Sequence, residues 1–173
     1  MLIVAAAAVT TGCASSGDVV TFRYTPPARA VATVERGRPV EHPGKVALGV
    51  VTERGEDPNA AGVVRDALAT ELGVRGYELG ADGPRIHVKV VTFEGRFRKG
   101  FASSRADGQV ELVVAVIGAD GATLHTSKLK SKVTRKPVLS RDANANAAIG
   151  DAMTAAFDNL FADEAFVRAL AQG

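Results

Sequence analysis

Few side chains in this sequence stand at the spacings that enzymes use. The histidines His42, His87 and His125 are far apart, and no His-x-His, His-Glu-x-x-His or cysteine pair accompanies them. No Gly-x-Ser-x-Gly motif is present, and the serines have no predicted histidine and aspartate partners. The glycines of segments 80–83 and 118–121 lack the spacing of a phosphate-binding loop. We therefore expect no catalytic activity, no metal site and no bound cofactor.

Three carboxylates, Glu53, Glu56 and Asp57, cluster after an apolar run. Oxygen ligands of this kind suit a divalent cation such as Ca²⁺. Clusters like this one are more often solvated side chains of a loop, which is the interpretation that we favour.

Cationic side chains form the strongest candidate for a binding surface. Lys128, Lys130 and Lys132 alternate along the sequence and therefore share one face of a predicted strand. Antiparallel pairing would gather other cations beside them into a patch that suits the phosphates of a glycolipid, anionic lipid headgroups or an acidic protein. The alternative is edge protection, because lysines along an edge strand oppose edge-to-edge pairing. The candidate set is Lys128, Lys130, Lys132, Arg135, Lys136, Arg96 and Arg98, with Lys99 and Arg105 nearby.

Composition limits the classes of protein that remain. The 173 residues are 46% hydrophobic and 23% charged, as expected for one globular domain with a short tail. The net charge of +2 is too small for binding nucleic acid by bulk electrostatics, so we expect no nucleic-acid partner. No apolar run approaches the roughly 18–20 residues that span a bilayer.

The single cysteine, Cys13, follows a short apolar stretch, Leu2–Val9, and the small residue Gly12. This arrangement resembles the lipobox of bacterial lipoproteins, although Thr10 stands where the motif usually has Leu. The resemblance implies that diacylglycerol is attached to the cysteine sulfur and that the chain is cut just before it. No Lys or Arg precedes the apolar run, so we expect the natural start to lie upstream of Met1.

These features predict three segments. Residues 1–12 are a lipoprotein signal peptide, and residues 13–44 are a lipid-anchored tether with a short strand at Val19–Tyr24. Residues 45–173 are a periplasmic domain. Acyl chains on Cys13, such as palmitate, would hold the protein in the membrane, and Ala14 resembles the sorting signal for the outer membrane. No cysteine remains for a disulfide, so the domain must depend on its hydrophobic core.

Hydrophobic periodicity predicts the order of elements in the domain. An apolar strand over 45–52 precedes a helix over 60–75 that ends at Gly76. Three strands follow, over 85–99, 109–117 and 123–135, with a bend at Gly95 and with Asp107-Gly108 and Asp120-Gly121 as turns. A helix capped by Asp142 and a short helix after Asp163 complete the chain. We predict an α+β fold: an antiparallel or mixed sheet of about four strands, with two main helices on one face.

Three segments resemble the YajG-type family of bacterial lipoproteins. They are the strand Val46–Thr52 with Glu53-Arg54, the helix end Glu71–Tyr77 and the segment Asp163–Leu170, and the resemblance extends over about Cys13–Gln172. It implies a small periplasmic domain on a lipid anchor, with no established catalytic residues. We therefore expect a noncatalytic outer-membrane lipoprotein that acts as a binding or assembly module, with an envelope protein or glycolipid as partner. The alternatives are an accessory factor that binds lipopolysaccharide or anionic lipid, and a lipoprotein that contacts peptidoglycan.

Overall fold

The computed structural model describes residues 44–53, 58–99, 104–136 and 141–172. Cys13, the expected signal peptide, nearly all of the expected tether, Glu56 and Asp57 lie outside these residues.

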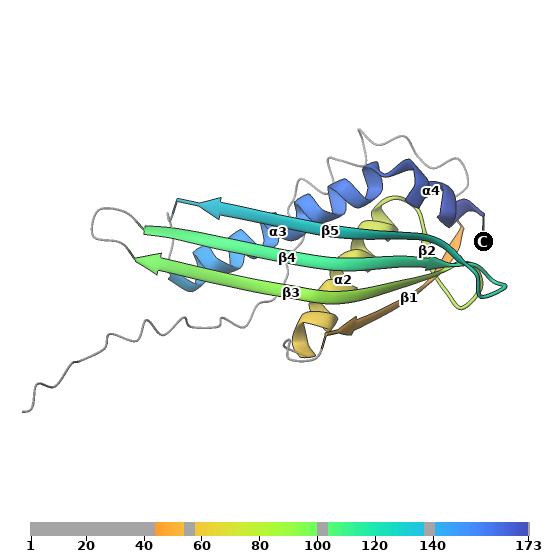
Figure 1. The fold of residues 1–173 in the computed structure, drawn as a ribbon, viewed down its shortest axis with the longest axis horizontal. Helices are drawn as coiled ribbons and strands as arrows, with labels where there is room; N and C mark the ends of the chain where they lie inside the picture. The colour runs from red at the N-terminus through yellow and green to blue at the C-terminus, as the bar shows by residue number, and fades with distance from the viewer. Residues whose placement is uncertain (1–43, 54–57, 100–103, 137–140, 173) are drawn as a thin grey trace, which may run out of the picture.

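Five strands form one mixed sheet in the order β2-β1-β3-β4-β5 (Figure 1). The strands are β1 (Lys45–Thr52), β2 (Glu78–Leu79), β3 (Arg85–Lys99), β4 (Ser104–Ile117) and β5 (Thr123–Arg135). Strand β1 runs parallel to both β2 and β3, whereas β3, β4 and β5 form an antiparallel meander. The edge strands of the described sheet are therefore the two-residue β2 and the long β5.

Three helices cover one face of this sheet: α2 (Pro58–Val74), α3 (Arg141–Ala162) and α4 (Glu164–Ala171). Helix α2 packs on β1, α3 crosses the meander, and α4 packs on the end of β5. In Figure 1 the sheet lies in front and the helices lie behind it. This arrangement confirms the predicted α+β fold. None of the described helices is both long enough and apolar enough to cross a bilayer.

Alternation along the strands builds the core between the sheet and the helices. Every second residue of β4 from Ala106 to Val116, and Ile86, Val88 and Val90 of β3, are buried against the helices, and the residues between them face the other side. Large side chains buried in this way each contribute about 1.5–3 kcal/mol before the entropy of ordering them is subtracted. The largest fully buried side chains include Leu68, Leu72, Ile86, Leu112, Ile149, Met153, Phe157, Leu160 and Phe166.

The bend expected at Gly95 was placed wrongly. The pairing of β3 with β4 shifts register between Val90 and Thr92, so Val91 is the bulged residue. The extra residue shifts the alternation of the strand by one position. Val90 and Phe93 therefore both face the helices although they are three positions apart.

The turn predicted at Asp107-Gly108 was also wrong, because β4 runs straight through both residues. Gly108 pairs with Gly95 across β3 and β4, and both glycines lie beneath α3. A Cβ atom added to Gly108 would lie 2.1 Å from the carbonyl oxygen of Ala148, and one added to Gly95 would lie 2.5 Å from Cδ1 of Ile149. These glycines therefore allow close approach of a helix to the sheet.

The helix ends use the residues that the sequence indicates in two of three cases. Gly76 follows α2 with a φ of 89°, as a helix-terminating glycine requires. Asp163 caps α4 by accepting hydrogen bonds from the N–H groups of Ala165 and Phe166. Helix α3, however, begins one residue before Asp142, so this residue is not its cap.

Candidate binding surface on the open face of the sheet

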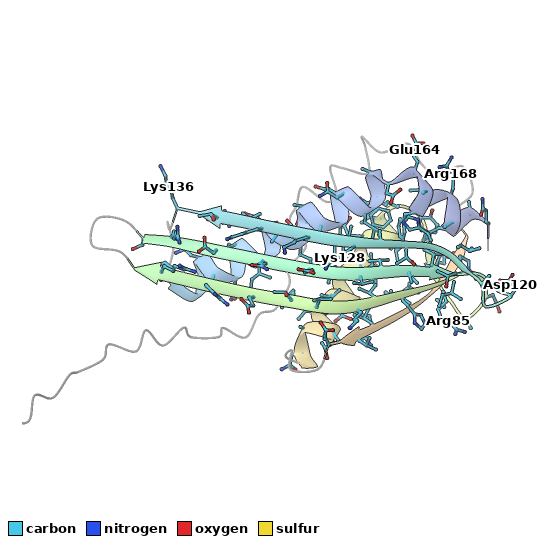
Figure 2. The ribbon with its side chains drawn as sticks, viewed as in Figure 1. Arg85, Asp120, Lys128, Lys136, Glu164 and Arg168 are labelled. Atoms are coloured by element: carbon cyan, nitrogen blue, oxygen red, sulfur yellow. The ribbon has the colours of Figure 1, made fainter. Side chains whose placement is uncertain are left out.

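No described helix covers the face of the sheet opposite α2, α3 and α4. On the three strands of the meander this face carries mostly charged and polar side chains, several of which are visible in Figure 2. We define the charged ladder as Thr92, Glu94, Arg96, Arg98, Arg105, Asp107, Gln109, Glu111, Lys128, Lys130, Lys132 and Thr134. Its six cationic and three acidic side chains leave an excess of three positive charges.

The lysines Lys128, Lys130 and Lys132 lie together on this face, as their alternation predicts, and all three are exposed. They belong to β5, which forms an edge of the sheet. This position fits the edge-protecting role of lysines, and it leaves their ammonium groups accessible to a ligand.

Glu111 of β4 holds two of these lysines. Its carboxylate lies 2.7 Å from Nζ of Lys128 and 3.4 Å from Nζ of Lys130, and only 7% of the residue is exposed. The hydrogen bond from Lys128 lowers the pKa of Glu111, and the same bond raises the pKa of Lys128. The three side chains therefore form a charged cluster that fixes the lysine ammonium groups above the sheet.

Asp107 has the same role nearer the end of the meander. Its carboxylate lies 3.6 Å from Nε of Arg98 and 3.4 Å from Nε of Arg105, and it accepts a hydrogen bond of 2.8 Å from Oγ1 of Thr134. One carboxylate thus joins side chains from three adjacent strands. On β3, Arg96 forms a separate ion pair of 2.6 Å with Glu94.

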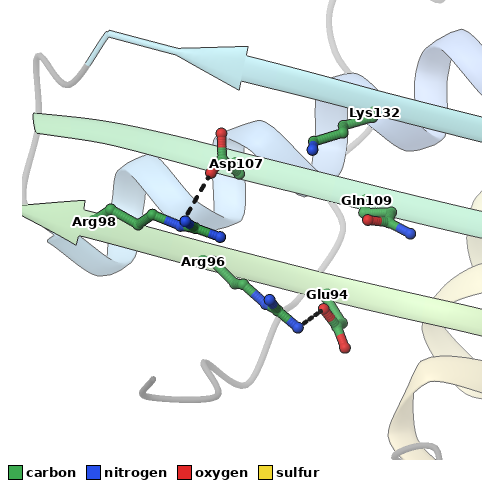
Figure 3. Close-up of a pocket in the computed structure, with 6 residues that line it drawn as sticks. All are labelled: Glu94, Arg96, Arg98, Asp107, Gln109 and Lys132. Carbon is green, nitrogen blue, oxygen red and sulfur yellow. Dashed lines mark ion pairs between the residues drawn. The ribbon is translucent and has the colours of Figure 1, made fainter. Parts of the chain in front are cut away.

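A shallow depression lies within the ladder (Figure 3). It is lined by Glu94, Arg96, Arg98, Asp107, Gln109 and Lys132, and its volume of about 40 Å³ is far below the roughly 300–1,000 Å³ of small-molecule pockets. Lys132 forms no ion pair with any carboxylate of the described residues. The depression therefore has room for a single anionic group or a few water molecules.

The structure divides the predicted cationic set between two places. Arg96 and Arg98 share the open face with the three lysines, although β4 and its acidic residues lie between them. Arg135 points to the helix side and forms an ion pair of 3.3 Å with Asp151 of α3. Lys136 is exposed just beyond the end of β5.

The acidic members of the ladder escaped the sequence analysis. Glu111 precedes the apolar run Leu112–Ile117 of the predicted strand, and Asp107 was assigned to a turn. The signal that would have found them is alternation: Arg105, Asp107, Gln109 and Glu111 recur at every second residue.

The other sequence candidates are not members of the ladder. Glu53 forms an ion pair of 2.6 Å with Lys89, and His87 is exposed on the open face of β3. On the helix side, Nε2 of His125 lies 3.2 Å from Oδ2 of Asp163. Among the described residues no three His, Cys, Asp or Glu side chains gather into a metal-binding group.

A model of a family described as "Uncharacterized lipoprotein" matches residues 51–171. The chain belongs to this lipoprotein family. No curated protein matches the sequence of this lipoprotein. The family description names no catalytic activity, and lipoproteins as a class are held at membranes by covalent lipid.

Two solved structures share the fold of this lipoprotein. A candidate lipoprotein from Caulobacter crescentus has 15% sequence identity and a TM-score of 0.50, over 82% of this chain and 96% of its own. Protein XCC0632 from Xanthomonas campestris has 18% identity and a TM-score of 0.51, over 82% of this chain and 90% of its own. At these identities the likeness extends to the fold alone.

Proposed function

We propose that this lipoprotein is a noncatalytic binding or assembly module of the cell envelope, held at the periplasmic face of the outer membrane by acyl chains on Cys13. The observation that carries the binding role is the charged ladder, where Glu111 and Asp107 each fix two cationic side chains on an exposed, rigid strand surface. Preordered side chains of this kind lose little conformational entropy when a partner binds.

Family membership and the Gly12-Cys13 step support the anchor. A single acyl chain attaches a protein only marginally, whereas several chains at about 0.8 kcal/mol per buried methylene hold it stably. In this proposal residues 1–12 are removed, residues 13–44 tether the domain, and residues 45–173 form it. The assignment to the YajG-type lipoproteins belongs to the same proposal, and it rests on the three resembling segments.

Intact mass measurement of the protein purified from bacterial membranes tests the anchor. We expect loss of residues 1–12 and the added mass of the acyl chains. A Cys13→Ser variant should leave the membrane fraction and should not incorporate labelled palmitate. An unmodified thiol with residues 1–12 still attached would contradict the proposal.

Site-specific photocrosslinking in the envelope tests the binding module. A photoreactive residue at Gln109 or Lys132 should capture a discrete partner, because both positions lie on the ladder. The same residue at Arg168, an exposed position on α4, is the matched control. Identical adducts from all three positions would count against the ladder as the binding surface.

The excess positive charge of the ladder favours one second candidate, an accessory factor that binds lipopolysaccharide or anionic lipid. Changing Lys128, Lys130 and Lys132 to Glu should then abolish binding to vesicles that contain anionic glycolipid. Changing Lys45, Arg65 and Arg168 to Glu, three exposed cations outside the ladder, alters the net charge equally and should preserve binding. Unchanged binding by the first variant would reject this candidate.

A further inference from the structure

The outer side of β1 is almost unpaired in the described structure. Strand β2 pairs with Lys45 and Val46 only. The last hydrogen bond between β1 and this segment runs from the N–H of Gly80 to the carbonyl of Val46, at 3.0 Å. Beyond this point no described strand lies beside β1 on that side. Most of the length of β1 therefore forms a sheet edge.

The direction of the backbone groups identifies the residues that a new strand would pair with. The N–H of Ala47 donates to the carbonyl of Pro84 on the β3 side, so the backbone groups of Ala47 face β3. In a parallel pairing successive residues face opposite neighbours. The N–H and C=O groups of Leu48, Val50 and Thr52 therefore face the unpaired edge.

Among the described residues, this edge lacks the charged and proline side chains that usually prevent strand addition. Residues 47–52 contain no charged side chain and no proline, in contrast to β5 with its lysines. Val51 is 61% exposed, which makes it the most exposed large hydrophobic residue described. An extended apolar strand without such protection is a template for another strand.

The helix side of the same edge is also incompletely covered. Leu48 and Val50 of β1 and Val63 of α2 pack against the core, yet each remains only partly buried. A further strand beside β1 would place alternate side chains over these three residues. The edge thus offers both backbone hydrogen bonds and an apolar surface.

We propose that the segment Val19–Tyr24 of this chain adds to the sheet as a strand at the free edge of β1. From Val20 onward its sequence alternates, with Val20, Phe22 and Tyr24 on one side and the polar Thr21 and Arg23 on the other, where Val19 is also placed. This pattern matches a strand with one face toward α2 and one face open. The 20 residues between Tyr24 and Lys45 span at most about 66–72 Å, well above the roughly 26 Å length of β1, so either strand direction can be reached.

Strand addition sets the distance between the domain and the membrane. With the segment unpaired, the 31 residues between Cys13 and Lys45 span up to about 100–110 Å. With Val19 fixed on the sheet, only five residues separate it from Cys13, a span of about 17 Å. The consequence for membrane distance rests on the proposed anchor, whereas the pairing itself does not.

Amide hydrogen exchange on the full chain carrying Cys13→Ser tests the pairing without the lipid. We expect slow exchange at every second amide of Val19–Tyr24 and at the amides of Leu48, Val50 and Thr52. Adding Phe22→Pro should accelerate exchange at these β1 amides by at least tenfold, because proline disrupts the added strand. Ala32→Pro, between the segment and β1, is the matched control and should leave the protection unchanged.

Three results would overturn the inference. The first is exchange at Val19–Tyr24 as fast as at residues 29–38. The second is Phe22→Pro leaving the β1 edge amides unaffected. The third is protection of the edge that rises with protein concentration, which would identify a second copy of the chain as the added strand. Failure of acylation at Cys13 would not affect any of these readouts.

Discussion

Glu111 of β4 forms an ion pair with Lys128 diagonally across to β5, with Nζ of Lys128 2.7 Å from Oε1 of Glu111, although Lys130 is the residue directly opposite Glu111. The carboxylate is largely buried between the strands, whereas the lysine side chain is 65% exposed. An acidic residue missed in the sequence thus determines where an accessible cation of the ladder is held.

This pair makes stability depend on pH in a defined direction. The pKa of Glu111 in the folded state is below its ordinary value, so the folded state binds its proton less readily than the unfolded state does. The stabilisation is therefore complete above the unfolded pKa near 4.5 and is lost as the pH falls through the lowered folded pKa. Urea unfolding of the wild type and of Glu111→Gln should differ most at pH 7 and converge toward pH 2. A constant difference across this range would contradict the assignment.

The close approach of α3 to the sheet predicts opposite effects for two Gly-to-Ala changes. Gly108→Ala places a Cβ atom 2.1 Å from the carbonyl of Ala148 and should lower the free energy of unfolding by about 1–3 kcal/mol or more. Gly62→Ala in α2 meets no atom within 4 Å and should raise it by about 0.4–1 kcal/mol. Denaturant titration measures both, and a neutral Gly108→Ala would refute the proposed packing.

Removal of the cap of α4 should lower the stability of the protein modestly. Asp163→Ala removes the acceptor for the N–H groups of Ala165 and Phe166 and should destabilise the protein by about 1 kcal/mol. Asp163→Ser keeps a capping oxygen and should recover most of this loss. If the two variants unfold at the same denaturant concentration, the contribution of Asp163 comes instead from its contact with His125.

Arg75 links the end of α2 to α3, because it forms an ion pair with Glu71 and also contacts Phe161. Glu71 is 4% exposed, and the guanidinium of Arg75 also lies 3.9 Å from the ring centroid of Phe161. Arg75→Ala leaves a buried carboxylate without its partner and should cost about 3–5 kcal/mol. Glu71→Gln avoids a buried charge and should cost less in the same thermal or denaturant unfolding measurement. Equal destabilisation by Arg75→Ala and Glu71→Gln would indicate that the buried charge of Glu71 does not cause the loss of stability.

Much of the fold follows from periodicity. The alternation in β3 and β5 gives their bounds, and the turn at Asp120-Gly121 lies between β4 and β5, where Gly121 donates to the carbonyl of Gly118 at 3.0 Å. Strand β2 escaped prediction because two residues carry no periodic signal. Gly108 was misassigned because glycine after aspartate favours a turn locally, whereas here it makes room for a helix that is distant in the sequence.

The candidate surface was predictable only in part. Alternation placed Lys128, Lys130 and Lys132 on one face and Leu129 and Val133 on the other, but it does not show which residues of neighbouring strands lie beside the lysines. Alternation also assigns Arg135 to the other face, with Leu129 and Val133, whereas its ion pair with Asp151 joins distant segments and has no local signal. The joining of Arg98 and Arg105 through Asp107 likewise depends on the strand register, which sequence alone does not specify.

The first strand described begins at the same end of the molecule as the turn between β4 and β5 and the last turn of α4 (Figure 1). Arg98 and Arg105 lie at the opposite end, where the last residue of β3 pairs with the first residue of β4. Strand β3 has 15 residues and is therefore about 50 Å long. A partner bound by these arginines would lie about the length of β3 away from the start of β1. A reporter fused to the carboxyl terminus would therefore not obstruct its binding.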